Sequence, residues 1–379
     1  MINKPTPTLL EQLENSGVGV DVDAGDPEVA KSLPFKPHDM TSNQILVHER
    51  IIAPENKELV EKTIKEMKGA DWKDIHIVLT ARFHAMVIPH IQGRVLAQVS
   101  TSNAYNKQAI IEHARKYRDA YNAEGVSNDR FCIKIPTTTA GVQAAAELYK
   151  EGIRTLGTSL FSLHQALAAA QGMMLSISPY FNEVRAHVEQ DLWPDVEDPA
   201  TQHPFSARMI HIRDAYAKLR AEGKHVPLNK AASCVTAREC MAMKELGADQ
   251  LTILIGSLTD LLTFDRLPVF VKGNEWQKRY KDIINKPNIQ WANWQAPEPT
   301  VSKKRMAELS HVDPLSKVMS KDLKLADPDV DYLADGVLDK MNEEDEVTRL
   351  RLKDALVLFD GAENDSKKEI QRLQALYNN

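Results

Sequence analysis

Short apolar stretches alternate along this chain with longer segments whose apolar residues recur every three or four positions. The short stretches predict strands, because a parallel strand buried on both faces is apolar throughout. They lie at 19–22, 40–42, 94–99, 131–135, 155–160, 175–178, 225–228 and 250–255. The longer segments predict helices, among them 107–124, 140–151, 163–171, 206–222 and 236–246. One face of the helix predicted at 107–124 carries the apolar residues Ile110, Ala114, Tyr117 and Tyr121. Such a stripe is typical of a helix that packs on a sheet.

Eight strands alternating with helices predict an α/β fold, a closed (β/α)8 TIM barrel rather than an open doubly wound sheet. We expect residues 1–295 to form this barrel, with additional helices at both ends of the chain. The segment 296–320 is rich in proline and lysine and predicts a linker or a loop crossing the barrel surface. Residues 321–379 predict charged C-terminal helices that pack on the barrel, over its mouth or against a partner subunit.

Composition excludes several functional classes. The 379 residues carry a net charge of −6 and a pI near 6.1, which argues against a nucleic-acid binder and against an anionic-membrane binder. The sequence contains no apolar run of 18 residues, and its first residues do not resemble a secretory signal. The three cysteines, Cys132, Cys234 and Cys240, show no metal-ligand spacing, as expected in a reducing cytosol. We therefore expect a cytoplasmic protein. Dinucleotide and P-loop phosphate motifs are also missing.

A single lysine, Lys134, lies inside the apolar strand predicted at 131–135. A buried ammonium is costly unless it is paired, so such a lysine readily loses its proton. The neutral amine is a nucleophile that can form a Schiff base with a carbonyl substrate. The alternative is a lysine at the strand end that reaches water or pairs with an acid.

Catalytic groups of a TIM barrel lie at the C-terminal ends of its strands. The predicted ends carry, besides Lys134, a carboxylate, two amides and several hydroxyls: Asp23, Asn43, Gln98, Thr158, Ser162, Ser178 and Tyr180. A lysine with one acid and a set of amides and hydroxyls is the equipment of a Schiff-base aldolase. The lysine provides the electron sink, the acid moves protons, and the polar groups hold the hydroxyls of the substrate.

At these positions the chain resembles the transaldolases. The matching stretches are VDAGD at 22–26, TSN at 41–43, GRV at 93–95, NDRFCIK at 128–134, EGI at 151–153, LFS at 160–162, ISP at 177–179 and GADQLTI at 247–253. They keep the order and spacing of the family from about residue 18 to about residue 358. The resemblance implies a (β/α)8 barrel that transfers dihydroxyacetone from a ketose phosphate to an aldose phosphate. It implies no metal or organic cofactor, and a homodimer is consistent with it.

The resemblance also assigns roles to individual residues. Lys134 resembles the Schiff-base lysine, and Asp23 resembles the carboxylate that acts as acid and base in C–C cleavage. Asn43, Thr158 and Ser178 resemble the residues that surround the dihydroxyacetone moiety and the catalytic water.

The chain departs from the family in its phosphate and water sites. Gln98 replaces a glutamate, and an amide can hold a water but cannot shuttle its proton. Glu183 replaces an arginine that contacts the sugar phosphate, and a carboxylate repels a phosphate dianion. Where a second phosphate arginine should follow an Ala-Ser pair, the chain has Val235, with Arg238 three residues later as a possible substitute.

Gln98 and Tyr180 together resemble the pair in fructose-6-phosphate aldolases, which use free dihydroxyacetone. The first hypothesis is therefore a class I aldolase that uses a dihydroxyacetone-type ketone and an uncharged or cationic acceptor, the latter pairing with Glu183. The second is a conventional transaldolase of the pentose phosphate pathway, in which Arg238 or a lysine of the tail binds the phosphate. The third is a non-catalytic barrel that binds a ligand or partner through its C-terminal helices.

Overall fold

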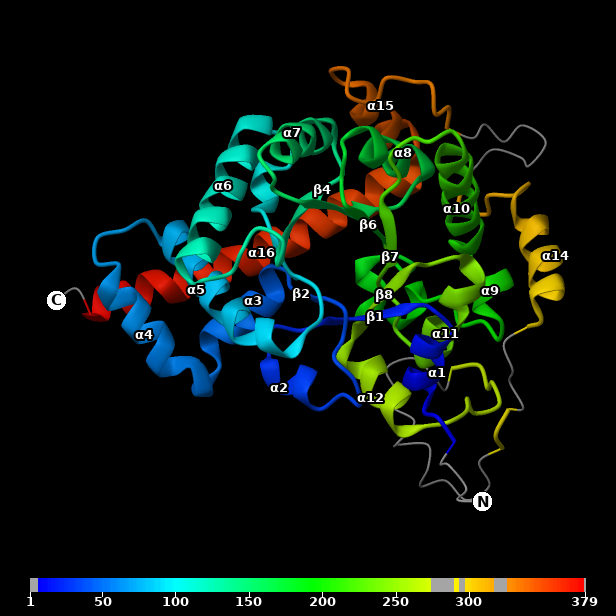
Figure 1. The fold of residues 1–379 in the computed structure, drawn as a ribbon, viewed down its shortest axis with the longest axis horizontal. Helices are drawn as coiled ribbons and strands as arrows, with labels where there is room; N and C mark the ends of the chain where they lie inside the picture. The colour runs from blue at the N-terminus through cyan, green and yellow to red at the C-terminus, as the bar shows by residue number, and fades with distance from the viewer. Residues whose placement is uncertain (1–5, 274–289, 293–296, 317–325, 378–379) are drawn as a thin grey trace.

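The computed structural model describes residues 6–273, 290–292, 297–316 and 326–377 of the chain (Figure 1). Eight parallel strands form a closed barrel in which each strand pairs with its neighbours in sequence and the last pairs with the first. The strands are β1 (Gly19–Asp23), β2 (Met40–Thr41), β3 (Val95–Gln98), β4 (Phe131–Pro136), β5 (Thr155–Leu160), β6 (Ser176–Pro179), β7 (Leu228–Ala231) and β8 (Gln250–Leu254). The predicted (β/α)8 barrel is confirmed.

Helices surround the barrel and extend the chain at both ends. They are α1 (Leu9–Asn15), α2 (Pro27–Lys31), α3 (Gln44–Ile52), α4 (Lys57–Glu66), α5 (Trp72–Val87), α6 (Lys107–Ala123), α7 (Thr139–Lys150), α8 (Leu163–Gln171), α9 (Pro199–Gln202), α10 (Ser206–Ala221), α11 (Ala237–Leu246), α12 (Ile255–Thr263), α14 (Pro299–Leu309), α15 (Val337–Glu344) and α16 (Glu346–Tyr377). The five helices predicted by periodicity end within one residue of their observed bounds. No helix in the described part of the chain is both long enough and apolar enough to span a bilayer.

Strand β7 begins three residues later than the predicted strand at 225–228, so that prediction was wrong in register. The cause is Lys230, a charged residue that interrupts the apolar pattern yet lies inside the barrel. Its Nζ lies 2.9 Å from Oδ2 of Asp21 and 2.5 Å from Oδ2 of Asp39. Two buried carboxylates compensate the cost of burying the ammonium, and a pattern of apolar residues cannot reveal such a contact.

Side chains in the barrel interior form layers because alternate residues of each strand point inward. Lys230 and its two carboxylates form the lowest layer. Above it lies a small apolar cluster of Leu96, Cys132 and Leu156. Two residues further along the same strands come Gln98, Lys134 and Thr158, all buried near the C-terminal ends of the strands.

The C-terminal part of the chain covers the barrel mouth. Helix α16 is a single 32-residue helix that contacts α3, α5 and the end of β5 (Figure 1). Arg208 of α10 fixes this part of the chain, since its guanidinium binds Asp345, just before α16, and Asp313, beyond α14. Moving either aspartate away would leave the buried guanidinium without its counter-charge, which is costly. These contacts therefore hold the start of α16 and the segment after α14 against α10.

Part of the segment 296–320, which we expected to be a linker or loop, forms helix α14. Pro299 occupies the first turn, where the missing N–H costs nothing, and residues 303–309 are good helix formers. Met306 is the buried contact of α14. Residues 296, 317–320 and 321–325 of the predicted linker and tail lie outside the described residues.

We predict that Lys230→Met lowers the free energy of unfolding at pH 7 by about 3–5 kcal/mol, because it leaves two buried carboxylates without a cation. Burial already raises the pKa of Asp21 to about 6. The folded state therefore takes up this proton at a higher pH than the unfolded chain, and the loss should shrink as the pH falls from 7 to 5. Urea denaturation at both pH values measures the effect.

Lys224→Met, which removes a half-exposed lysine, is the matched control and should change stability little. A Lys230→Met protein as stable as the control at pH 7 would contradict the prediction.

Candidate active site

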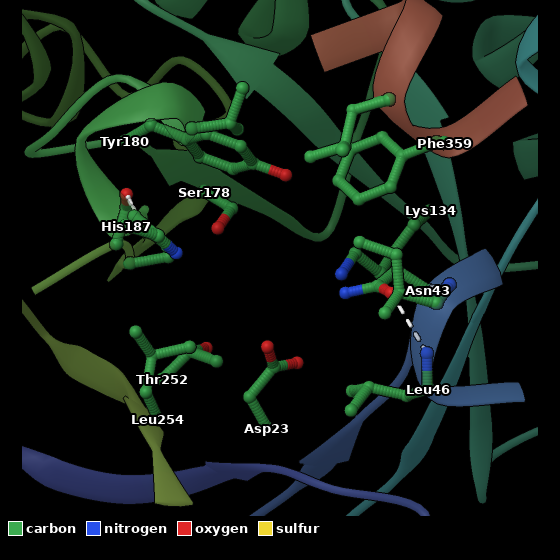
Figure 2. Close-up of a pocket in the computed structure, with 15 residues that line it drawn as sticks. Asp23, Asn43, Leu46, Lys134, Ser178, Tyr180, His187, Thr252, Leu254 and Phe359 are labelled. Carbon is green, nitrogen blue, oxygen red and sulfur yellow. Dashed lines mark hydrogen bonds between the residues drawn. The ribbon is translucent and has the colours of Figure 1, made fainter. Parts of the chain in front are cut away.

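A cavity of about 210 Å³ opens at the C-terminal ends of the strands, beneath α16 (Figure 2). It is lined by Asp23, Asn43, Ile45, Leu46, Lys134, Ser178, Tyr180, Val184, His187, Ala232, Ser233, Thr252, Leu254, Leu358 and Phe359. Five residues predicted from the strand ends are thus brought together from β1, β4, β6 and the loop after β2. Leu358 and Phe359 come from α16 and close one wall with apolar side chains.

Lys134 is buried at the end of β4, with 6% of its surface exposed. Its Nζ donates a hydrogen bond to the carbonyl oxygen of Ser42 at 3.0 Å. Burial lowers the pKa of Lys134 below its ordinary value, while the nearby charge of Asp23 partly opposes the shift. The structure therefore favours the neutral amine at this position more than water would.

Asp23 is the last residue of β1, and its carboxylate faces the cavity (Figure 2). Its Oδ1 accepts a hydrogen bond from the hydroxyl of Thr41 at 2.5 Å. Burial raises the pKa of Asp23, and Lys134 and the Thr41 hydroxyl partly oppose this. Burial therefore favours the neutral form of both Asp23 and Lys134. A carboxyl group with a raised pKa is suited to give a proton to a bound substrate and to take it back.

Asn43 is oriented by the start of helix α3. As the N-cap of this helix, it accepts hydrogen bonds through Oδ1 from the backbone N–H groups of Ile45 and Leu46. The carbonyl side of the amide is therefore occupied, which leaves the NH2 group as the donor on the cavity side. Figure 2 shows Asn43 beside Lys134. The arrangement suits a donor to a carbonyl or hydroxyl oxygen of a bound molecule.

Tyr180 and Thr158 form a pair of hydroxyls on the wall formed by β5 and β6. Their oxygens lie 2.9 Å apart, and Tyr180 lines the cavity while Thr158 lies behind it. Burial raises the pKa of Tyr180 to about 12, so the phenol keeps its proton at neutral pH. Each of the two hydroxyls can donate and accept a hydrogen bond while it stays uncharged.

Gln98 lies next to Lys134 across the β3–β4 ladder but does not line the cavity. With 3% of its surface exposed, neither Nε2 nor Oε1 has a hydrogen-bond partner among the described residues. A buried amide that is unpaired at both ends is unusual in a folded protein, and a bound polar molecule is one way to satisfy it. This position suits a residue that holds a small polar molecule near the lysine.

Besides Gln98 and Thr158, three further predicted site residues do not line the cavity. Ser162 is the N-cap of α8, and its hydroxyl bonds the side chain of Gln165. Arg238 donates to the carbonyl oxygen of Pro268 at 2.6 Å. Glu183 lies 3.7 Å from a guanidinium nitrogen of Arg351 on α16. Local sequence does not show that other groups bind these three side chains.

Sequence reasoning missed three polar cavity residues, His187, Ser233 and Thr252. Thr252 lies in the predicted last strand at 250–255, so strand alternation could have identified it. Ser233 follows β7, whose register was misplaced. His187 ends the short 3₁₀ helix η4 (Val184–His187), a single turn with no periodic signal. Over the described residues, no three His, Cys, Asp or Glu side chains meet as metal ligands would.

The chain is similar to known transaldolases. Residues 22–290 match the family model described as transaldolase/fructose-6-phosphate aldolase. A transaldolase of Trichormus variabilis is 32% identical over 278 residues, which cover 69% of this chain and 79% of that protein. A transaldolase of Haemophilus influenzae is 30% identical over 67% of this chain and 79% of its own length. A transaldolase of Nostoc sp. is 35% identical over 51% of this chain and 61% of its own length.

A solved structure of an IMP dehydrogenase/GMP reductase-like protein from Corynebacterium glutamicum overlaps 62% of this chain and 63% of its own, at 12% identity. Its TM-score of 0.37 is too low to carry an argument.

We predict that Asp23→Asn lowers the pKa of Lys134 further, because the substitution removes the negative charge that favours the ammonium. Protein labelled with ¹³C at lysine Cε allows this pKa to be read from the chemical shift across a pH titration. Ser178→Ala, which changes a neutral cavity residue, is the control and should leave the titration in place. A Lys134 pKa that stays the same or rises in Asp23→Asn would contradict the electrostatic account.

Proposed function

This chain belongs to the transaldolase/fructose-6-phosphate aldolase family and is an enzyme of the transaldolase or aldolase type, and from that premise we propose that Lys134 forms a Schiff base with a dihydroxyacetone-type ketone. The enzyme then makes or breaks a C–C bond with an acceptor that carries no phosphate. The observation behind this proposal is the buried lysine, whose lowered pKa makes a nucleophilic amine beside a buried carboxylate.

In the proposed reaction, Nζ of Lys134 attacks the ketone carbon, and the carbinolamine loses water to give an iminium. Asp23 supplies the proton that leaves with the water. Loss of a proton from the neighbouring carbon gives an enamine, which attacks the aldehyde carbon of the acceptor while the aldehyde oxygen takes up a proton. Water then hydrolyses the new iminium and restores the free amine.

The remaining polar groups support this sequence by position. Tyr180, paired with Thr158, is a protonated phenol on the cavity wall and suits proton transfer through a water. Gln98 has an unpaired amide next to the lysine and suits a residue that holds that water. Asn43 and Ser178 line the cavity as donors for the hydroxyl groups of the ketone.

The charges around the cavity support an acceptor without phosphate. Asp23 and Lys134 are the only formally charged side chains among the described residues that line it, with His187 neutral. A phosphate dianion is usually bound by arginine, lysine or several N–H donors. Arg238 is turned towards the carbonyl oxygen of Pro268 instead. Glu183 faces Arg351 rather than the cavity, so an uncharged acceptor fits better than a cationic one.

One observation favours a conventional transaldolase as the second candidate. Arg351 lies beside Glu183, the residue that replaces the phosphate arginine of the family, and its Nη1 is buried without a hydrogen-bond partner among the described residues. If α16 shifts when substrate binds, this guanidinium would meet a phosphate. A non-catalytic barrel, the third hypothesis, gives no reason for the lowered pKa of Lys134.

We predict that borohydride reduction in the presence of dihydroxyacetone adds one dihydroxyacetone-sized unit to the wild-type protein and none to Lys134→Met. The reason is that reduction fixes an iminium as a stable amine. Intact mass spectrometry measures the adduct. Lys150→Met, which removes an exposed lysine of α7, is the matched control and should still be labelled. An adduct on Lys134→Met would assign the chemistry to another lysine, and no adduct on the wild type would remove the proposal.

For the acceptor, we predict that kcat/KM with dihydroxyacetone as donor is at least about tenfold higher for glyceraldehyde than for glyceraldehyde 3-phosphate, a difference of about 1.4 kcal/mol. Steady-state kinetics with both acceptors measures it. Efficient transfer from fructose 6-phosphate to erythrose 4-phosphate that is lost in Arg351→Gln would instead establish the second candidate. Arg349→Gln, two residues earlier on the same helix, is the matched control.

A further inference from the structure

Opposite Lys134, the cavity is lined by two polar residues that the proposed chemistry does not use, His187 and Ser233. Figure 2 shows Ser178 and His187 facing Lys134 and Asn43 across the cavity. His187 comes from η4 after β6, and Ser233 comes from the loop between β7 and α11. A ketone held on Lys134 would direct its acceptor partner towards these two residues, because the cavity closes on the other sides with Phe359 and Leu254.

His187 and Ser233 are held together. Nε2 of His187 lies 2.6 Å from Oγ of Ser233, and that hydroxyl donates to the carbonyl oxygen of Asn182 at 2.8 Å. With its single proton committed to Asn182, the serine oxygen is left to accept from the imidazole N–H. Burial lowers the pKa of His187 to about 4, so the ring is neutral at physiological pH.

The loop that carries Ser233 is fixed in an unfavourable conformation. Ser233 has a φ of 65°, in the left-handed region that a serine adopts only when its surroundings require it. Asn182 supplies part of that requirement, since its side-chain NH2 donates to the carbonyl oxygen of Ser233 at 2.9 Å. The same NH2 also donates to Glu239 at 2.8 Å, and Glu239 accepts from the backbone N–H of Val235. Strain that is held by such a network clusters at ligand sites.

We propose that His187, positioned by Ser233, determines acceptor specificity by binding a terminal hydroxyl of an uncharged hydroxyaldehyde. This inference rests on the proposed function and names the substrate class of the same site. The ring nitrogen of the neutral imidazole that carries no proton accepts a hydrogen bond from an alcohol, whereas a phosphate dianion has no proton to donate and needs cationic donors. A cavity of about 210 Å³ is smaller than the ~300 Å³ at which sites for drug-sized ligands begin, so a short sugar suits it.

The test compares His187→Leu and His187→Gln with the wild type, using dihydroxyacetone as donor and glyceraldehyde as acceptor. We expect His187→Leu to raise KM for glyceraldehyde about tenfold while kcat falls less, because the lost contact acts in binding the acceptor. His187→Gln keeps a donor and an acceptor at this position and should recover much of the loss. With deoxygenated propionaldehyde as acceptor, wild type and His187→Leu should differ little.

Borohydride labelling with dihydroxyacetone runs in parallel, because it reports the donor step alone. Undiminished labelling of His187→Leu together with a raised KM for glyceraldehyde supports the inference. Undiminished labelling with an unchanged KM overturns the inference and leaves the proposed function standing. Absence of labelling in the wild type overturns both. His225→Leu, which replaces the histidine before β7 at the other end of the barrel, is the matched control for loss of an imidazole.

Discussion

The proposed chemistry depends on the burial of one lysine amine, that of Lys134, inside a closed ring of strands. Closure makes inward-facing residues at corresponding strand ends meet, although they lie far apart in the sequence. Lys134 and Asp23 meet in this way, and the same loss of water shifts the pKa of each towards its neutral form. With more solvent around them, the pKa values of both groups would lie closer to their ordinary values.

A second buried lysine in the same barrel shows that burial alone does not decide the charge. Burial lowers the pKa of Lys230 too, but Asp21 and Asp39 outweigh it and the net pKa is raised. Lys134 has one nearby carboxylate that is itself shifted towards neutrality, so burial dominates there. The number of carboxylates therefore separates a structural cation from a candidate nucleophile. The apolar layer around Cys132 lies between the two lysines along the strands and keeps the two charge systems apart.

The parts of the site that could be predicted from sequence are those fixed by strand alternation. Lys134, Asp23 and Tyr180 lie at or just beyond the ends of strands that the apolar pattern located, and the structure places all three on the cavity. The pattern failed at β7, because Lys230 is satisfied by contacts with Asp21 and Asp39 that lie about 200 positions away in the chain. It also failed at His187, which sits in a single 3₁₀ turn whose place is set by tertiary contacts. Local sequence shows the periodicity of a strand or helix. It does not show which distant side chain will pair with a polar residue.

One side of the cavity is formed by strand ends and the other by loops and helix α16. Substrate specificity can therefore change on the second side without a change in the barrel. The lysine side is built from strand ends, where a shift of one residue would turn every side chain to the other face of the sheet. The His187 side is built from η4, the loop at Ser233 and helix α16, which can change composition without disturbing the ladder. Glu183 and Val235 lie in those same loops, and Arg351 lies on α16. In the proposed function, loss of cationic donors there alters which acceptor binds, while the amine of Lys134 and the carboxylate of Asp23 keep their positions at the strand ends. Because a substitution in these loops leaves the strand register unchanged, the reaction type is expected to be more constrained in this family than the charge of the substrate.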